Sequence, residues 1–250
     1  MRKGIILAGG KGKRLHPITK VISKQLIPVY DKPLIFYPLS VLIKIGITDI
    51  LIICVPTDLK IFKKLIHDLR LKNIKISFKS QKKPNGLPEA FKIGKKFIGK
   101  SDVALILGDN IFYNKDLNSI INKYIYEKNT ASIFIKKVKK PNEFGVITKT
   151  SRGINIEEKP KKPKSNNVIT GIYFFPNDVC KKVVKLKFSS RGETEITDLI
   201  KIYINENRIN LVNLKNTIWL DTGNPDNLLK ASNIIYKLKK NKKISVGNLD

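Results

Sequence analysis

The sequence predicts an α/β fold built around a parallel sheet. Short apolar runs typical of buried strands recur along the first half of the chain, and segments with helical apolar spacing lie between them. Continuous Ile, Leu and Val runs are typical of strands covered on both faces. Alternation of strand and helix favours parallel strands joined by right-handed crossovers. The 250 residues, 42% hydrophobic and 28% charged, fit one such domain and exclude a wholly disordered chain.

The expected elements follow from these patterns in chain order. In the first half, we predict strands at 4–8, 49–55, 73–78 and 103–107 and helices at 38–44, 59–69 and 117–125. In the second half, we predict strands at 130–138, 145–148, 171–175 and 210–214 and helices at 196–205 and 224–238. No internal repeat or Gly/Ser linker interrupts the chain, so one domain is expected over residues 1–236. Residues 237–250 are Lys-rich and lose the apolar period, which predicts a frayed tail.

Neither a membrane span nor a disulfide framework is expected. The apolar stretch 34–55 is broken by Lys44 and Asp49, and the N-terminal apolar run is too short for a signal peptide. We therefore expect a cytoplasmic protein without a membrane partner. Cys54 lies in an apolar run, which indicates a buried reduced thiol, and with Cys180 as the only other cysteine neither a disulfide framework nor a cysteine zinc site is implied.

The net charge of +29 first points to a polyanionic partner. The basic residues, however, are 43 Lys and only 6 Arg, and they are spread along the whole chain. Proteins that read bases depend heavily on Arg. We therefore expect no nucleic-acid partner and treat nucleic-acid binding as the competing interpretation. The positive field should still attract a small anionic substrate.

A glycine-rich loop follows the first predicted strand. Its sequence reads Leu7-Ala8-Gly9-Gly10-Lys11-Gly12-Lys13-Arg14-Leu15. Glycines after a strand let the backbone approach a ligand and point N–H groups at it. The loop lacks the Gly-Lys-Ser/Thr of a Walker A motif, and Leu15 stands where the dinucleotide fingerprint needs a small residue. A tight turn remains the alternative, but Arg14 and the later Lys24 favour a phosphate site.

Further blocks extend this pattern along the chain. They include Ser23-Lys24-Gln25-Leu26-Ile27-Pro28, Leu107-Gly108-Asp109-Asn110, Glu157-Glu158-Lys159-Pro160, Arg191-Gly192-Glu193 with Glu195-Ile196-Thr197-Asp198, and Trp219-Leu220-Asp221-Thr222-Gly223. In this order, from Lys3 to about Tyr236, the chain resembles the glucose-1-phosphate thymidylyltransferase family of nucleotide-sugar enzymes. The resemblance implies a mixed, mostly parallel central sheet with Rossmann-like topology.

The resemblance also implies a reaction. A thymidylyl group would pass from dTTP to glucose 1-phosphate by in-line single displacement with Mg²⁺, giving dTDP-glucose and pyrophosphate, the first step of dTDP-rhamnose-type sugar synthesis. The alternative within the same class is a uridylyltransferase or another sugar-1-phosphate nucleotidyltransferase. Both reactants are polyanions, so the site needs fixed cations, while a phosphate nucleophile needs no strong base.

Two carboxylates are candidate metal ligands. Asp109 follows a predicted strand at its carboxyl end, where open α/β sheets place ligands, and Asp221 holds a second strand-end position. Oxygen ligands suit Mg²⁺. Taken singly, each Asp is more often a turn former, but the resemblance implies this pair as the metal ligands. His16 and His67 have no partner at metal spacing, so we interpret them as structural or surface residues.

The resemblance assigns the remaining site residues. Arg14 and Lys24 would be catalytic, Arg14 as a clamp on the triphosphate and Lys24 at the α-phosphate. The Gln81 amide can donate and accept together, which matches the edge of thymine or uracil, and Gly86-Leu87 is more similar to thymidylyl than to uridylyl enzymes. The implied nucleotide-binding residues are Leu7, Ala8, Gly9, Gly10, Gln25, Gln81, Gly86 and Asp109. The implied sugar-phosphate residues are Gly145, Glu158, Lys159 and Ile169, although Glu158 and Lys159 alone would suggest a solvated charge run.

The chain departs from the family pattern at three places. Lys13 replaces the usual Thr, Pro88-Glu89 replaces Ala-Gln, and relatives continue beyond Asp250. Pro88 is tolerable only in the first turn of a following helix. The family's later residues contribute to subunit packing and to a regulatory nucleotide site. We expect a homo-oligomer with weakened feedback by dTDP-rhamnose.

Overall fold

The computed structural model describes residues 2–10, 12–151 and 153–249. Its contacts divide the chain into two compact units, each assembled from separate segments. One unit, here called the β4 unit, comprises Lys3–Pro84, Ile106–Lys123 and Thr217–Asp250. The other, here called the β11 unit, comprises Met1–Arg2, Asn85–Leu105 and Tyr124–Asn216. The expectation of one domain over residues 1–236 remains a prediction.

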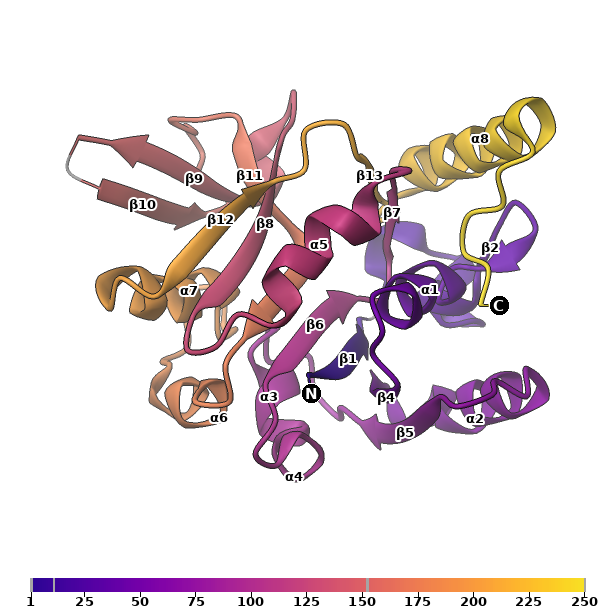
Figure 1. Cartoon of the computed structure of the whole chain (residues 1–250). Coiled ribbons are helices and arrows are strands. Elements are labelled where there is room, and N and C mark those ends of the chain that lie inside the picture. Colours follow the sequence, from indigo (N-terminus) through magenta and orange to yellow (C-terminus); the bar gives the residue numbers. More distant parts are fainter. Residues whose placement is uncertain (1, 11, 152, 250) are drawn as a thin grey trace. The chain divides into compact units, whose positions relative to one another are not determined.

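The β4 unit contains the parallel strands that the sequence predicts. Strand β4 runs parallel to β1 on one side and to β5 on the other, with Ile6 opposite Ile52 and Ile52 opposite Phe78 (Figure 1). Its helices and strands are β1 (Lys3–Ala8), β2 (Pro28–Val29), β3 (Lys32–Pro33), α1 (Phe36–Lys44), β4 (Asp49–Cys54), α2 (Leu59–Asp68), β5 (Lys75–Ser80), β7 (Asn110–Tyr113), β13 (Ile218–Asp221) and α8 (Pro225–Lys242). Helix α5 (Leu117–Ile125) lies mostly in this unit.

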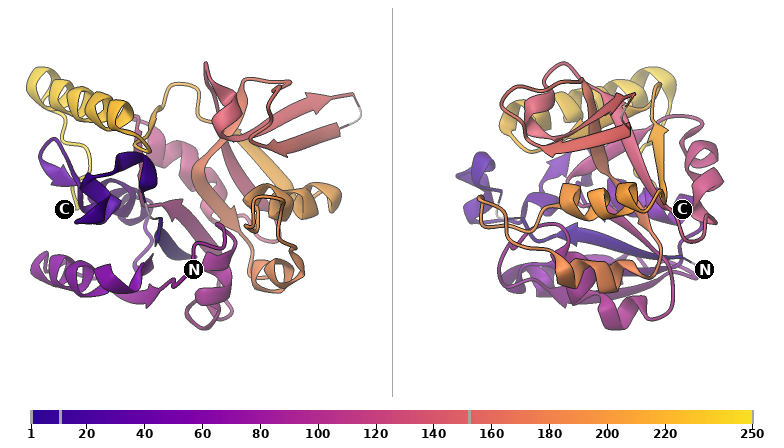
Figure 2. Two further views of the ribbon diagram at one scale, coloured as in Figure 1. Left: turned by 180° about the vertical axis from the view of Figure 1, so that it is seen from behind. Right: turned by 90° about the vertical axis from the view of Figure 1, so that its left-hand side faces the viewer.

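The β11 unit carries the antiparallel part of the sheet. Strand β11 pairs antiparallel with β8 and β9, β9 pairs antiparallel with β10, and β12 runs parallel to β8 (Figure 2). The elements of this unit are α3 (Glu89–Ile93), α4 (Lys95–Ile98), β8 (Ala131–Lys137), β9 (Gly145–Thr150), β10 (Gly153–Glu158), β11 (Asn167–Phe175), α6 (Val179–Lys182), α7 (Ile196–Asn205) and β12 (Ile209–Asn213). Strand β6 (Val103–Leu107) is divided between the two units. The prediction of a mixed sheet is therefore confirmed.

Helix α8 continues four residues beyond its predicted end at residue 238. Asn224 caps α8, because its Oδ1 accepts a hydrogen bond from the Asn227 N–H at 2.8 Å, and Pro225 opens the helix. The helix continues to Lys242, and Leu238 and Val246 are buried against the β4 unit core. The lysines of this segment are exposed, so its Lys-rich composition does not reveal the buried apolar positions.

Arg2 is buried in the β11 unit with only 5% of its surface exposed. Its guanidinium donates hydrogen bonds to four backbone carbonyls and lies 5.0 Å from the centre of the Phe174 ring. The four acceptors are the carbonyl oxygens of Val103, Ile125, Glu127 and Phe175. Arginine suits this role because its planar fork offers five donors. The residue therefore ties the chain start to three distant segments.

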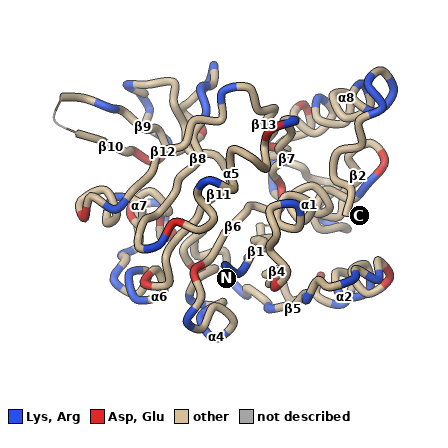
Figure 3. Tube along the Cα trace, in the orientation of Figure 1, with Lys and Arg blue, Asp and Glu red and all other residues tan. Residues whose placement is uncertain are grey.

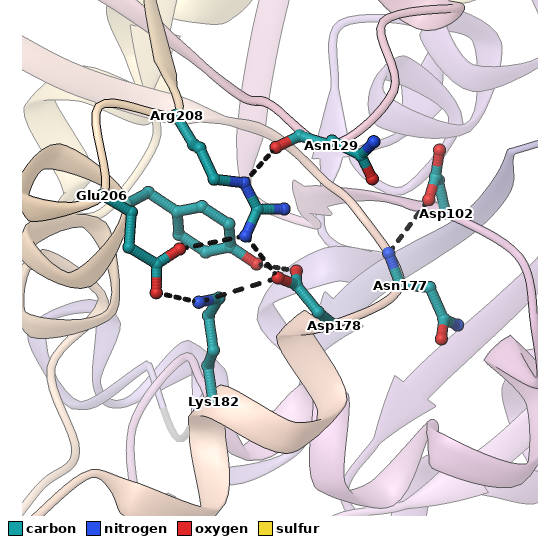
Figure 4. Close-up of polar contacts among 8 residues, drawn as sticks. Asp102, Asn129, Asn177, Asp178, Lys182, Glu206 and Arg208 are labelled. Atoms are coloured by element: carbon teal, nitrogen blue, oxygen red, sulfur yellow. Dashed lines mark hydrogen bonds and ion pairs between the residues drawn. The ribbon is translucent and has the colours of Figure 1, made fainter.

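A second polar network joins α6, α7 and β12 in the β11 unit (Figure 4). Asp178 accepts hydrogen bonds from the Tyr203 hydroxyl at 2.7 Å and from Arg208 Nη1 at 2.8 Å. Lys182 pairs with both Asp178 and Glu206. Burial, and then the hydrogen bond to Asp178, raise the pKa of Tyr203, so its hydroxyl stays protonated and keeps donating.

Basic residues are dispersed over the elements of both units (Figure 3). This agrees with their even spread along the sequence. Among the described residues, no helix combines the length and the apolar character that crossing a membrane requires. Both cysteines are free and buried, as predicted for Cys54.

We predict that Arg2→Lys destabilises the protein by about 3 kcal/mol, because an ammonium has three donors and cannot satisfy four carbonyls at once. Arg208→Lys is the matched control, since that arginine lies in the more exposed network of Figure 4. Urea unfolding of both variants measures the difference. Equal losses of unfolding free energy in the two variants would show that the buried Arg2 guanidinium contributes no more to stability than the more exposed Arg208 guanidinium.

Candidate active site

The glycine-rich loop of the β4 unit leaves open space beside one glycine and contacts Gln81 at another. A Cβ at Gly10 would meet nothing within 4 Å, whereas a Cβ at Gly9 would lie 2.5 Å from Gln81 Oε1. Gly12 has a φ of +58°, a conformation that glycine adopts without strain. Lys11, part of the predicted loop, lies outside the described residues.

Gln81 and the end of β1 are fixed by the backbone. Gln81 follows β5 directly, its N–H donates to the Cys54 carbonyl at 2.8 Å, and only 5% of its surface is exposed. The Leu7 carbonyl accepts from the Gly108 N–H at 2.9 Å, and Ala8 is buried. The structure thus brings Leu7, Ala8, Gly9 and Gln81 to the carboxyl ends of β1 and β5, the two strands that flank β4, where open sheets of this type bind ligands.

Lys24 and Gln25 lie in a short 3-10 turn, Lys24–Leu26, and both are buried. Lys24 Nζ lies 2.5 Å from Asp109 Oδ2. Gln25 is anchored at both ends, since its Oε1 accepts from Ser23 Oγ at 3.0 Å and its carbonyl accepts from the Ile35 N–H at 2.8 Å. The predicted cation and the predicted carboxylate are therefore in direct contact.

A two-stranded ribbon, β7 with β13, positions the two predicted metal ligands. Asp221 is the last residue of β13 and stands opposite Asn110, the first residue of β7, so Asp109 adjoins the same end of the ribbon. Thr222 reinforces this end, because its N–H and its hydroxyl both donate to the Asp109 carbonyl, at 3.2 and 2.9 Å. Arg14 lies there too, since a Cβ at Gly223 would be 2.5 Å from Arg14 Nη2 and 3.0 Å from Asp221 Oδ1.

The two carboxylates differ in their electrostatics. Burial alone would raise the pKa of Asp109, but the adjacent Lys24 ammonium outweighs it and holds that pKa below its ordinary value. Burial, and next the Asp109 carboxylate, raise the pKa of Asp221 to about 6. Two like charges held together in a partly buried site are costly unless a cation lies near them.

This pair fits a divalent metal ion. Within the described ranges, no group of three or more His, Cys, Asp or Glu side chains forms a metal cluster. Mg²⁺ binds through one or two carboxylates together with water and substrate phosphates. Asp109 and Asp221, of which Asp221 is the less compensated, match that pattern of ligands.

The predicted sugar-phosphate residues come together in the β11 unit. Gly145 opens β9 and pairs across the ribbon with Glu158, the last residue of β10. A Cβ at Gly145 would lie 2.7 Å from Ile169 Cδ1 and 2.8 Å from Thr197 Cγ2, so these side chains close over the glycine. Lys159 follows in a left-handed conformation, φ +43°, and its N–H donates to the Phe144 carbonyl at 3.0 Å.

Three further residues, Arg191, Glu195 and Thr197, join this group, here called the sugar-phosphate half-site, although the sequence alone predicted no role for them. Arg191 Nη1 lies 3.4 Å from both Glu158 Oε1 and Glu195 Oε1, and the Thr197 hydroxyl is buried beside Glu158. Burial, then the Glu195 carboxylate, raise the pKa of Glu158. The block 191–198 was part of the sequence resemblance, but only the fold shows that its side chains face Glu158.

Gly86 packs against the backbone of Thr194. It lies in the β11 unit with a φ of +105°, and a Cβ there would lie 2.0 Å from the Thr194 carbonyl oxygen. Glycine is therefore required at this position for backbone packing alone. Pro88 immediately precedes α3, which confirms the expectation that it is tolerated only at a helix start.

Comparison with known proteins agrees with this architecture. The Nucleotidyl transferase family model matches residues 3–237. A glucose-1-phosphate thymidylyltransferase of Neisseria meningitidis is 43% identical over 99% of this chain and 87% of its own length, and one of Mycolicibacterium smegmatis is 44% identical over 98% and 86%.

Solved structures give the same result. A Bacillus anthracis chain described as a glucose-1-phosphate thymidylyltransferase, crystallised with sucrose, superposes with a TM-score of 0.86 at 35% identity, covering 94% of this chain and 95% of its own. A UDP-glucose pyrophosphorylase with bound UDP-glucose has a TM-score of 0.82 at 25% identity, covering 95% and 99%. The chain that brings Arg14, Lys24, Asp109 and Asp221 together is thus a member of the nucleotidyl transferase family.

Proposed function

We propose that this protein transfers a thymidylyl group from dTTP to glucose 1-phosphate, with release of pyrophosphate. The observation that carries the proposal is the convergence of Arg14, Lys24, Asp109 and Asp221 at one end of the β7–β13 ribbon, beside the glycine-rich loop. The close relatives named for this activity support the same substrates. The likeness to a UDP-glucose pyrophosphorylase is compatible with the alternative, a uridylyltransferase.

The chain's own residues perform positioning and charge neutralisation. Gly9 and Gly10 admit the triphosphate to the loop backbone, and the exposed Arg14 guanidinium binds its oxygens as a fork. Lys24 uses one donor on Asp109 and has further donors for the α-phosphate. Gln81, packed on Gly9, offers its amide to the base. Fixed cations of this kind stabilise the charge that develops during phosphoryl transfer.

Mg²⁺ would be held by Asp109 and Asp221 and would supply charge neutralisation on the triphosphate. The sugar phosphate would bind in the half-site of the β11 unit. Glu158, supported by Arg191, accepts from sugar hydroxyls. Lys159 binds the phosphate that attacks, and Gly145 lines the sugar pocket through its backbone. Beyond these substrates, we propose a cytoplasmic homo-oligomer without nucleic-acid or membrane partners.

The direct test is product identification after incubation with Mg²⁺, glucose 1-phosphate and an equimolar mixture of dTTP, UTP, ATP, CTP and GTP. Mass spectrometry should find dTDP-glucose as the main product, because Gly86-Leu87 is more similar to thymidylyl than to uridylyl enzymes and the relatives at 43–44% identity are named for thymidylyl transfer. A preference for UDP-glucose would establish the alternative, and the absence of any nucleotide sugar would remove the proposed activity.

Asp221→Asn should reduce kcat by at least about a hundredfold, because it removes one of the charges on which transition-state stabilisation depends. The free energy of unfolding should be unchanged or higher in this variant. Burial and the Asp109 carboxylate raise the pKa of Asp221, so the ionised carboxylate destabilises the folded protein at pH 8. Steady-state kinetics and thermal unfolding in EDTA measure the two effects. Near-normal turnover at saturating Mg²⁺ would exclude Asp221 from the metal site.

Lys159→Ala should raise the KM for glucose 1-phosphate more than the KM for dTTP, because the lost cation belongs to the sugar-phosphate half-site. Lys161→Ala is the matched control, since it removes the same charge from an exposed position two residues away. Both substrates are titrated for both variants. If the two variants behave alike, Lys159 contributes only to the general positive field.

A further inference from the structure

A chain of hydrogen bonds connects Trp219 to Asp109 through Asn110. The Trp219 indole N–H donates to Asn110 Oδ1 at 2.6 Å, and Asn110 Nδ2 donates to Asp109 Oδ1 at 2.9 Å. Asn110 is buried, with 3% of its surface exposed, so water cannot easily replace either bond. The catalytic scheme above assigns no role to Trp219 or Asn110.

The β7–β13 ribbon makes this chain of bonds possible. Trp219 stands opposite Phe112 and Asp221 opposite Asn110. Asp221 and the two residues here called the relay, Trp219 and Asn110, therefore belong to one ribbon, which Asp109 directly precedes. A movement of the ribbon at Trp219 would therefore act on the end that carries Asp109 and Asp221.

The chemistry of the indole fixes the direction of every bond in the chain. An indole N–H can only donate, so the amide oxygen of Asn110 must face Trp219 and its NH₂ group must face Asp109. Asp109 then accepts from Asn110 on Oδ1 and from Lys24 on Oδ2. Each carboxylate oxygen retains a lone pair, and the carboxylate plane is held by a donor on each side.

We propose that Trp219 and Asn110 are positioning residues that orient the Asp109 carboxylate and thereby set the affinity of the site for its divalent metal ion. The inference rests on the proposed role of Asp109 and Asp221 as metal ligands. Without the indole donor, the Asn110 amide can turn its oxygen toward Asp109, which places two acceptors against each other. Partners that orient metal ligands in this way typically change metal affinity by about 10- to 100-fold.

The test compares Mn²⁺ affinity, measured by electron paramagnetic resonance of the free ion, in wild type, Trp219→Phe and Phe112→Leu. Trp219→Phe keeps the ring and removes the donor, and it should weaken Mn²⁺ binding about tenfold. Phe112→Leu is the matched control, because Phe112 packs on the same ribbon but takes no part in the relay. Unchanged affinity in Trp219→Phe, or an equal loss in Phe112→Leu, would overturn the proposal.

Turnover provides a second readout. If Trp219 acts through metal affinity, the kcat of Trp219→Phe should approach the wild-type value as the Mg²⁺ concentration rises. A loss that no Mg²⁺ concentration restores would indicate a merely structural role and would contradict the relay.

The single tryptophan offers an independent check on Asn110. Because Trp219 is the only tryptophan in the chain, its fluorescence reports the indole at the end of the relay. Saturating Mg²⁺ should change the tryptophan emission of wild type and should not change that of Asn110→Ala. The same change in emission in both proteins would show that the effect of metal binding does not reach Trp219 through Asn110.

Asp221→Asn separates failure of the relay from failure of the proposed metal site. If this variant binds Mn²⁺ as tightly as wild type, the carboxylate pair is not the metal site, and the proposed role of the relay is wrong as well. If Asp221→Asn loses Mn²⁺ while Trp219→Phe retains it, the metal site stands and the relay alone is wrong.

Discussion

The repulsion between Asp109 and Asp221 is the constraint on which the site of the β4 unit depends. Folding buries Asp221 and brings it close to the Asp109 carboxylate. Burial, and next this like charge, raise the pKa of Asp221 to about 6. Lys24 compensates Asp109 and leaves Asp221 the less compensated of the two. The protein therefore presents a fixed negative charge that a divalent cation can relieve, surrounded by cations that suit the phosphates of a nucleotide.

The surrounding fold maintains this arrangement. Parallel strands β1, β4 and β5 bring the glycine loop and Gln81 to one edge, and the β7–β13 ribbon adds the carboxylates. The β11 unit supplies a separate group of residues around Gly145, in which Arg191 compensates the two carboxylates of Glu158 and Glu195. The site of the β4 unit and the group around Gly145 in the β11 unit thus each combine buried acids with an arginine or lysine. This pattern suits substrates that carry both phosphates and hydroxyls.

Much of this could be predicted from the sequence, and the rest could not for physical reasons. Long apolar runs such as Val103–Leu107 predicted their strands because burial on both faces leaves a clear pattern. The four-residue strands β7 and β13 carry no such signal, since they exist only through their mutual pairing. Arg2 near the chain start gave no sign of burial, because its partners are backbone carbonyls distant in sequence. The burial of Leu238 and Val246 was not predicted, because exposed lysines surround them in the sequence.

The central claim, that Asp109 and Asp221 together hold a divalent metal ion beside the bound nucleotide, is tested most directly by crystallography. Crystals grown with Mn²⁺ and a dTTP analogue that resists cleavage between the α- and β-phosphates would locate the metal by anomalous scattering. The account predicts an anomalous peak coordinated by one oxygen from each carboxylate and by phosphate oxygens of the analogue. A metal ion bound to the nucleotide alone, with Asp221 taking no part, would contradict it.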